Sequence, residues 1–388
     1  MDRQRLLILG GYGNTGRPLA QLLLQETDAS LVLAGRNLDR AQALATEFNA
    51  RFGGHRVDGR TVDAADTASL GRAFGDVDMV VVTSSTADCA EQVSSAALAA
   101  GVDYFDVQYS THKTAVLQRV ARQIEDAGVC FITDGGFHPG LPAALIRYLG
   151  PEFDALEAAR VGSVIKIDWN TLALAPSTME EFVGEFMDFQ TLVFRDGRWE
   201  KAGALAMMKP ETMDFGREIG PGFGRQYCLP MFLEEMRALP TEFPKLKETG
   251  FFVGGFNWMV DWFISPLVMA ALKLWPLRAK RPMGRLMLWG LRTFGKPPYG
   301  TLLKAEARGQ KDGQARAIDL ILYHQDGYAF TAIPAAACLL QYLDGSIRRP
   351  GLWLQATAVE PGRFMLDMER MGIQIRRTVA ASASPSQM

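Results

Sequence analysis

The sequence predicts an α/β fold, in which a doubly wound parallel sheet is followed by a second, mixed-sheet α+β domain. Three observations support this prediction. Short apolar segments alternate with alanine- and leucine-rich segments of helical spacing over the first 150 residues. A glycine cluster follows the first apolar segment. Beyond residue 150 the alternation ends and hairpin signals begin, so we expect the 388 residues to form two domains.

The apolar segments of the first domain have the length of buried strands. We expect strands at Leu6–Gly10, Leu31–Gly35, Met79–Thr83, Tyr104–Val107 and Val129–Thr133, with a weaker one at Arg56–Val62. We expect helices between them at Asp39–Phe48, Asp88–Ala100 and Lys113–Ala127. Strands this apolar are typical of a parallel sheet covered on both faces. Together the elements predict a Rossmann-type domain over residues 1–145.

The second domain is expected over residues 146–330, with part of 331–388 returning to the first. Its expected elements are a strand at Ala159–Trp169, a helix from a capping box of Ser177 and Glu180 to about Gln190, and a late helix at Ala335–Leu343. Two hairpins are expected, one over Leu192–Glu200 with its turn at Asp196-Gly197, the other over Ala315–Ala332 with its turn at Asp326-Gly327.

Composition excludes several classes of protein. A formal net charge of −2 gives no overall positive field for nucleic acid. The four cysteines lack the spacing of a disulfide framework, and His55, His112 and His324 lack metal-ligand spacing. The first apolar segment is too short for a secretory signal. We therefore expect a cytoplasmic protein without a resident metal, and a homodimer.

A G-x-G-x-x-G motif stands between the first strand and the first helix. Its first glycine allows a tight turn, its second lets the backbone approach a pyrophosphate, and its third lets helix and strand pack closely. The helix N-terminus then offers N–H groups to the phosphates. The alternative is an ordinary glycine-rich turn. We expect a dinucleotide at Gly11, Tyr12, Gly13, Asn14, Thr15 and Gly16.

Arg36, at the end of the second strand, indicates which dinucleotide binds. A site for NAD usually has an acidic residue here, which accepts a hydrogen bond from the ribose 2′-hydroxyl. A guanidinium suits a 2′-phosphate, so Arg36, with Asn37 beside it, favours NADP(H) over NAD(H). By position alone, we place Asp63 near the adenine, and Ser84 and Ser85 along the path of the phosphates and the nicotinamide.

Three residues are candidates for proton transfer beside the cofactor, because hydride transfer needs a proton donor or a fixed cation near the developing charge. Tyr109 and Lys113 have the spacing Y-x-x-x-K, in which the lysine lowers the tyrosine pKa, although nine tyrosines make a chance match an alternative. His138 lies in a loop expected at the nicotinamide end, and packing or capping is its alternative role. We expect Asp106 or Asp134 to orient one of these proton-transfer candidates or to cap a helix.

Five segments carry a resemblance to a known family. They are GGYGNTG (10–16), LAGR (33–36), AAGVDYFDVQYS (99–110), DGGFHPGLPAAL (134–145) and TAIPAAACLLQYLDGSIRRPGLW (331–353). The combination resembles the saccharopine dehydrogenase-like oxidoreductases over about half of the chain. This resemblance implies an NADP-binding Rossmann domain, a C-terminal segment that returns to it, and hydride chemistry.

The sequence also departs from that family. Saccharopine-forming relatives typically have an acidic residue before the Pro-Gly pair, where this chain has His138. Their amino-acid substrates need cationic groups for two carboxylates, and the nearest candidates, Arg147, Arg217 and Arg225, are not paired by anything in the sequence. Because the family also contains enoyl reductases of lipid pathways, the resemblance leaves the substrate open.

Residues 251–296 are apolar, rich in tryptophan and then basic. Phe251–Leu272 contains one charged residue, Asp261, and Lys273–Lys296 contains seven basic residues and no acidic one. The central carboxylate disfavours a transmembrane helix. Aromatic residues beside a basic segment suit a helix lying in a membrane interface. The equal alternative is a subunit interface or the lining of an apolar substrate pocket.

The leading hypothesis is an NADP(H)-dependent oxidoreductase that acts on a C=O, C=N or C=C group of a hydrophobic, lipid-like small molecule, at the inner face of a membrane. One alternative is a membrane-associated scaffold or sensor that binds NADP(H) without turnover. Another is an amino-acid imine reductase of the saccharopine type.

Overall fold

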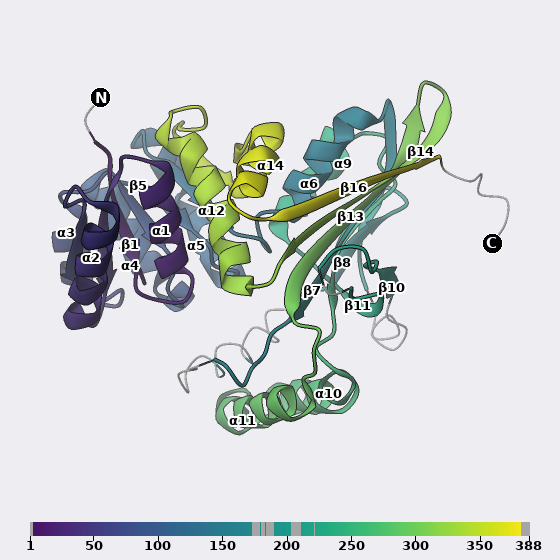
Figure 1. Cartoon of the computed structure of the whole chain (residues 1–388), viewed down its shortest axis with the longest axis horizontal. Coiled ribbons are helices and arrows are strands. Elements are labelled where there is room, and N and C mark those ends of the chain that lie inside the picture. Colours follow the sequence, from purple (N-terminus) through teal and green to yellow (C-terminus); the bar gives the residue numbers. More distant parts are fainter. Residues whose placement is uncertain are drawn as a thin grey trace. The chain divides into compact units, whose positions relative to one another are not determined.

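The apolar segments near the N-terminus form one parallel sheet with the order β15-β6-β5-β4-β1-β2-β3. Its strands are β1 (Arg5–Leu9), β2 (Ser30–Gly35), β3 (Val57–Thr61), β4 (Met79–Val82), β5 (Asp103–Asp106), β6 (Cys130–Thr133) and β15 (Gly351–Leu354). Strands β1 and β5 of this sheet are labelled in Figure 1. The strand order reverses between β1 and β4, and a doubly wound sheet binds its ligand at the carboxyl ends of the strands at such a point. The predicted Rossmann-type sheet is confirmed.

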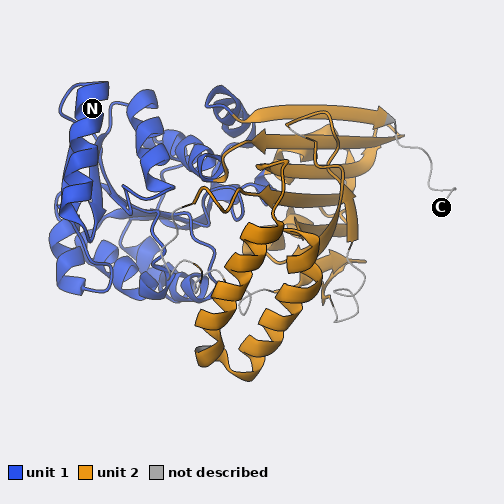
Figure 2. Cartoon of the chain, turned by 60° about the horizontal axis from the view of Figure 1, so that its bottom comes forward, with its two compact units in different colours: residues 1–144, 328–372 blue, residues 145–327, 373–388 orange. Residues whose placement is uncertain are grey.

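The structure is a computed structural model, and it describes residues 3–172, 179, 183, 190–202, 211–220 and 222–381. The helix expected from Ser177 and Glu180 lies outside the described residues, apart from Met179 and Val183. The chain divides into two compact units (Figure 2). Unit 1 comprises residues 1–144 and 328–372, and unit 2 comprises residues 145–327 and 373–388.

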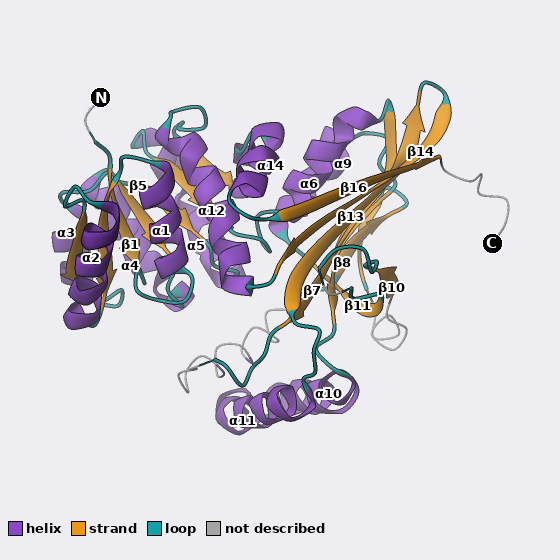
Figure 3. Ribbon diagram, viewed as in Figure 1, coloured by secondary structure: helices purple, strands orange, loops and turns teal. Residues whose placement is uncertain are grey.

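The helices of unit 1 alternate with its strands (Figure 3). They are α1 (Gly16–Glu26), α2 (Leu38–Phe52), α3 (Thr67–Phe74), α4 (Ala90–Ala100), α5 (Thr111–Asp126), α12 (Gly327–Leu343), α13 (Gln355–Ala358) and α14 (Pro361–Arg370), while α6 (Pro142–Leu149) leads into unit 2. Leu6, Leu7, Ile8 and Leu9 of β1 are all buried. Because successive strand residues point to opposite faces, both faces of the sheet are covered, as predicted.

Unit 2 contains a nine-stranded sheet with the order β10-β11-β12-β7-β13-β14-β16, and β8 and β9 extend from β12. The strands are β7 (Ala155–Lys166), β8 (Leu192–Arg195), β9 (Arg198–Lys201), β10 (Glu211–Asp214), β11 (Arg225–Met231), β12 (Glu248–Gly254), β13 (Gly300–Lys311), β14 (Gln314–His324) and β16 (Gln374–Ala381). Strands β12 and β7 are parallel, and the other neighbours are antiparallel. The predicted mixed sheet is confirmed.

One expected hairpin is right and the other is wrong. Strands β8 and β9 turn at Asp196 and Gly197, which both have positive φ, as a two-residue hairpin turn requires. The second hairpin turns at Asp312-Gly313 between β13 and β14, and Gly327 instead begins α12. The helix forms there because the residues after Gly327 are apolar on nearly every side and are buried as a helix, without the alternation of a strand.

The apolar segment 251–272 is divided between a strand and helices. Its first residues belong to β12, and it continues through a π-helical turn, η4 (Val260–Ile264), into α10 (Ser265–Leu274) and α11 (Pro276–Phe294). A short helix, α9 (Leu239–Glu242), precedes β12. Among the described residues, we find no helix that combines the length and the apolarity needed to cross a bilayer.

Candidate cofactor and active site

The glycine loop turns sharply between β1 and α1. Gly10 has a φ of 87°, the Gly11 N–H donates to the Ile8 carbonyl at 3.0 Å, and the Gly13 N–H donates to the Gly10 carbonyl at 2.8 Å. Helix α1 then begins at Gly16 with no side-chain cap and no acidic residue in its first turn. The positive end of the helix dipole is therefore open to an anion.

The space around the glycines fits a dinucleotide. A Cβ atom at Gly16 would lie 2.2 Å from the Gly10 carbonyl oxygen, so only glycine allows α1 to pack this closely on the loop. A Cβ at Gly13 would have only the Gly10 backbone within 4 Å, which leaves the rest of its surroundings open. A pyrophosphate suits this cradle, because it approaches the backbone at the second glycine. The loop and the start of α1 would hold it.

Tyr12 fills the space beside the end of β2. Its hydroxyl accepts a hydrogen bond from the Asn37 N–H at 2.9 Å, and a Cβ at Gly35 would lie 2.5 Å from that hydroxyl. The Arg40 guanidinium lies 4.9 Å from the centre of the Tyr12 ring. Arg36 and Arg40 are both exposed, so two cations lie at the position where a dinucleotide held by the glycine loop would place its ribose 2′-substituent. Sequence reasoning missed Arg40, although its position one helical turn after Arg36 was a signal.

Two predicted cofactor residues have local structural roles. The Asn37 side chain caps α2 by accepting from the Arg40 N–H at 3.0 Å. The Asp63 carboxylate accepts from the Ala65 N–H at 3.0 Å in the turn after β3. Both residues are exposed. Their contact with a cofactor stays a prediction.

The segment after β4 lies against the glycine loop. A Cβ at Gly10 would lie 2.8 Å from the Ser84 backbone nitrogen, and the Ser84 carbonyl accepts from the Gln108 side chain at 2.5 Å. Ser85 follows as an exposed residue. The Thr83 hydroxyl donates to the Leu9 carbonyl at 3.1 Å and joins β4 to the end of β1. The structure thus brings Ser84 to the predicted site and adds Thr83 as a supporting residue.

Lys113 is buried in a cluster with two carboxylates at the carboxyl ends of β5 and β6. Its Nζ lies 2.6 Å from Asp106 Oδ1 and 2.7 Å from Asp134 Oδ1, and it donates to the Gln108 carbonyl at 2.5 Å. Thr133 Oγ1 donates to the other Asp106 oxygen at 2.6 Å. Burial alone would lower the pKa of Lys113, but the two carboxylates raise it. The lysine is therefore a permanent cation that joins two loops.

The Y-x-x-x-K spacing does not form a helical pair. Ser110 caps α5 by accepting from the Lys113 N–H at 3.2 Å, so Tyr109 precedes the helix. The three ammonium protons of Lys113 have partners in Asp106, Asp134 and Gln108. The geometry therefore favours a positioning role for Lys113, and a catalytic role for either residue stays a prediction.

The loop after β6 has an unusual backbone. Asp134 has a φ of 55°, and Gly136 and Gly140 also have positive φ. Gln355, from the C-terminal part of unit 1, pairs with both backbone groups of Gly136, at 3.1 Å to the nitrogen and 3.0 Å to the oxygen. A Cβ at Gly140 would lie 2.5 Å from the Gln355 side-chain nitrogen. Gln355 therefore fixes this loop, and no local sequence signal pointed to it.

His138 lies partly buried in the same loop, with its ring centre 4.0 Å from that of Phe137. Phe137 in turn stacks on Phe330 at 5.2 Å. Burial lowers the pKa of the His138 imidazole to about 3. At neutral pH the ring is therefore uncharged, and it is suited to hydrogen bonding more than to giving up a proton as an imidazolium.

Two of the three arginines considered for an amino-acid substrate face carboxylates of the chain. Arg147 Nε lies 3.0 Å from Glu242 Oε1, and Arg225 Nε lies 3.9 Å from Asp214 Oδ2. A Cβ at Gly222 would lie 3.1 Å from the Arg217 Cα, which places Arg217 in the loop that leads to β11. Nothing in the described residues joins the three into one carboxylate site.

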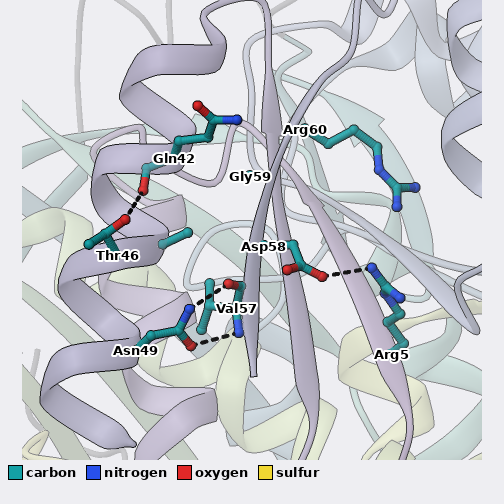
Figure 4. A pocket seen from close by; sticks show the side chains of 9 residues that line it. Arg5, Gln42, Thr46, Asn49, Val57, Asp58, Gly59 and Arg60 are labelled. Atoms are coloured by element: carbon teal, nitrogen blue, oxygen red, sulfur yellow. Dashed lines mark hydrogen bonds and ion pairs between the residues drawn. The ribbon is translucent and has the colours of Figure 1, made fainter. Parts of the chain in front are cut away.

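A cavity of about 500 Å³ lies elsewhere in unit 1, between α2 and the edge strand β3 (Figure 4). Arg5, at the start of β1, lines it, so the cavity lies toward the amino ends of the strands. Several of its polar groups are paired: Arg5 binds Asp58 at 2.8 Å, and the Asn49 side chain bonds both backbone groups of Val57 (Figure 4). This cavity is separate from the glycine loop, which follows the carboxyl end of β1.

Residues 6–132 match the family model described as the saccharopine dehydrogenase NADP binding domain. By this match, residues 6–132 are similar to the NADP-binding domain of saccharopine dehydrogenases. The glycine loop, Arg36, Arg40 and the Lys113–Asp106 pair all lie within this domain. Asp134, His138 and Gln355 lie beyond it and complete the loops at its carboxyl edge.

Two known proteins extend the comparison. The shikimate dehydrogenase (NADP(+)) of Aromatoleum aromaticum is 33% identical over 158 residues, which are 37% of this chain and 54% of that protein. The chain thus matches about half the length of this relative. The saccharopine dehydrogenase (L-Glu forming) of Saccharomyces cerevisiae has a similar structure, with a TM-score of 0.70 at 15% identity, covering 97% of this chain and 100% of that one. This likeness extends over both units and shows a shared fold.

Proposed function

We propose that the chain is an NADP(H)-dependent oxidoreductase that transfers hydride to or from a C=O, C=N or C=C group of a hydrophobic small molecule. The observation that carries the proposal is the glycine cradle with Arg36 and Arg40 at the end of β2, inside a domain that matches an NADP-binding family. The two similar proteins are both named dehydrogenases, which supports oxidoreductase chemistry. The arginines support NADP(H) over NAD(H).

The residues of the chain would position the substrate and stabilise charge, while the bound cofactor would supply the hydride. Reduction of a carbonyl adds hydride to carbon and a proton to oxygen, so a donor must face that oxygen. We assign the neutral His138 imidazole as the hydrogen-bond donor that stabilises the developing charge, with the Tyr109 hydroxyl as the second candidate, while water supplies the proton that the oxygen gains. Lys113 would hold the two loops that carry these side chains.

The acidic partners of two arginines in unit 2 support a hydrophobic substrate over one with two carboxylates. A substrate with two carboxylates needs unpaired cations, and Arg147 and Arg225 instead face Glu242 and Asp214. Unit 2 also exposes several aromatic side chains, including Trp258 and Trp262, and these side chains favour contact with apolar molecules.

The proposal is tested by following NADPH oxidation with aldehydes, imines and enoyl compounds of increasing alkyl chain length. We expect turnover that rises with chain length. Gly13→Val fills the cradle and should abolish both NADPH binding and turnover, while Gly71→Ala, where an added Cβ meets nothing within 4 Å, should change neither. Circular dichroism checks that both variants fold.

Two outcomes would count against the proposal. NADPH binding without turnover on any of these compounds would favour a binding protein over an enzyme. Equal turnover in Gly13→Val and the unaltered chain would place the cofactor somewhere other than the glycine loop.

A further inference from the structure

Unit 2 contains a helical hairpin, residues 256–296, made of η4, α10 and α11. Helices α10 and α11 pack side by side and project from the end of the unit 2 sheet (Figure 1, Figure 2). They meet at Trp275, and Pro276 occupies the first position of α11, where its missing N–H has no cost.

One face of the helical hairpin is already used for packing. Val260, Ile264, Val268 and Leu272 are buried together with Met287 and Leu291 of α11. Met179 and Val183 belong to the same cluster. The inner face of the hairpin therefore forms a hydrophobic cluster of its own, separate from the cluster on the sheet of unit 2.

The other face exposes large apolar side chains. Seven of the eleven exposed large hydrophobic residues in the described part of the chain fall between residues 258 and 289. They are Trp258 (59% exposed), Trp262 (51%), Phe263 (62%), Leu267 (53%), Leu274 (66%), Trp275 (59%) and Trp289 (52%). Soluble surfaces rarely expose so many large apolar side chains on neighbouring helices, and such a concentration is typical of an interaction site.

Four of the aromatic rings contact one another in series, and Trp262 contacts Tyr227 of β11. Trp258 contacts both Phe263 and Phe294, at 6.1 and 5.9 Å between ring centres, and Trp289 contacts Phe294 at 5.5 Å. Leu274 and Trp275 form the tip where the two helices meet. Tryptophan is favoured where a surface is apolar on one side and polar on the other, as at a lipid headgroup layer.

Basic residues accompany this face. Lys273–Lys296 contains seven lysines and arginines and no acidic residue. Lys273, Arg278 and Arg285 are exposed, and no ion pair is found for them within the described residues. A polybasic helix beside exposed aromatic residues is complementary to a negatively charged, apolar layer.

We propose that the helical hairpin docks on an anionic lipid bilayer, with its aromatic residues in the headgroup layer and its basic residues against the lipid phosphates. A second copy of the chain fits less well, because a two-fold symmetric contact would place like charges from the two copies together. A spanning mode is disfavoured because α10 has only 10 residues and α11, with 19 residues, carries five basic side chains. The proposal is independent of the cofactor site, which lies in unit 1.

The test is co-sedimentation of the full chain with vesicles of phosphatidylcholine alone, or of equimolar phosphatidylcholine and phosphatidylglycerol. We expect binding to the anionic vesicles, a blue shift of tryptophan emission, and weaker binding at high salt. Lys273→Glu with Arg278→Glu should weaken binding by roughly thirtyfold or more. Trp262→Ser with Phe263→Ser should also remove the emission shift.

Matched controls use exposed residues of unit 1. Arg72→Glu with Arg119→Glu, and Leu366→Ser, should leave vesicle binding unchanged. The helical-hairpin variants and the unit 1 controls should all bind NADPH with the affinity of the unaltered chain. A variant that loses vesicle binding but keeps its NADPH affinity therefore tests the membrane proposal alone.

Three results would overturn the proposal. The first is no binding to anionic vesicles. The second is equal binding to neutral and anionic vesicles with no effect of the charge reversals. The third is a stable dimer in sedimentation analysis that Trp262→Ser with Phe263→Ser converts to monomer, because the exposed face would then be a subunit interface.

Discussion

Two arginines, one directly after β2 and one in the first turn of α2, define the expected cofactor preference. Arg36 follows the strand directly, and Arg40 is held against the Tyr12 ring. Each charge-assisted contact to a 2′-phosphate contributes about 1.5–3 kcal/mol. Arg36→Ala and Arg40→Ala should therefore each raise the Kd for NADPH by roughly tenfold or more. Calorimetric titration with NADPH and NADH measures this directly.

The same titration contains its own control. NADH has no 2′-phosphate, so its affinity should be almost unchanged in both variants. Arg72→Ala, at an exposed site on α3, should alter neither affinity. If Arg36→Ala weakened NADH as much as NADPH, the arginine would contact a part common to both cofactors.

Lys113 is predicted to be essential for stability. Lys113→Met would leave Asp106 and Asp134 buried without a cation, which costs about 3–5 kcal/mol. Urea unfolding followed by circular dichroism measures this loss. Adding Asp106→Asn and Asp134→Asn should restore a large part of it, because the uncompensated charges disappear. A loss below about 1 kcal/mol in Lys113→Met would show that the cluster is not a buried ion network.

Sequence reasoning located residues whose role depends on local spacing. The glycine loop and Arg36 follow from a strand, a turn and a helix in succession. The role of Lys113 depends on Asp134, 21 residues away, and the role of Gln355 depends on Gly136, 219 residues away. Such pairs form only after the sheet brings the ends of its strands together, so spacing along the chain could not show them.

At the scale of elements, the same dipeptide has two outcomes. Asp196-Gly197 and Asp312-Gly313 turn hairpins, whereas Asp326-Gly327 leads into α12. The difference comes from the flanking residues, since β13 and β14 pair through eleven positions on either side of their turn. Turn signals therefore predict hairpins only where both flanks can pair as strands.

Asp261 provides a pH test of the helical hairpin. Its carboxylate accepts from the Phe256 N–H at 2.9 Å, and burial raises its pKa from 3.8 to about 6. A raised folded-state pKa contributes stability below pH 3.8, and this contribution is lost as the pH rises through about 6. Between these two pH values the free energy of unfolding should fall by an amount on the order of 3 kcal/mol.

Asp261→Asn should therefore flatten the fall in stability between about pH 4 and pH 6 while keeping the oxygen that accepts from Phe256. Tryptophan emission during urea unfolding is a suitable measurement, because six of the seven tryptophans lie in unit 2. Asp196→Asn, in an exposed turn, is the matched control. An unchanged pH dependence in Asp261→Asn would show that this carboxyl ionises freely.

At the scale of the whole molecule, the alternation of strands and helices predicted unit 1, because each βαβ step is local in sequence. The sheet of unit 2 could be predicted only as mixed. Its pairings join β7 to β12 and β13, and β14 to β16, across long stretches of chain. They depend on which apolar faces meet, and a single sequence does not specify this.

We expect this chain to bind NADP(H) through its glycine loop and arginines. The most direct test is calorimetric titration of the purified chain with NADPH and with NADH. We expect saturable binding of NADPH at one site, at least about tenfold tighter than binding of NADH. Binding of neither cofactor would contradict this expectation, because the glycine loop would then be only a turn between β1 and α1.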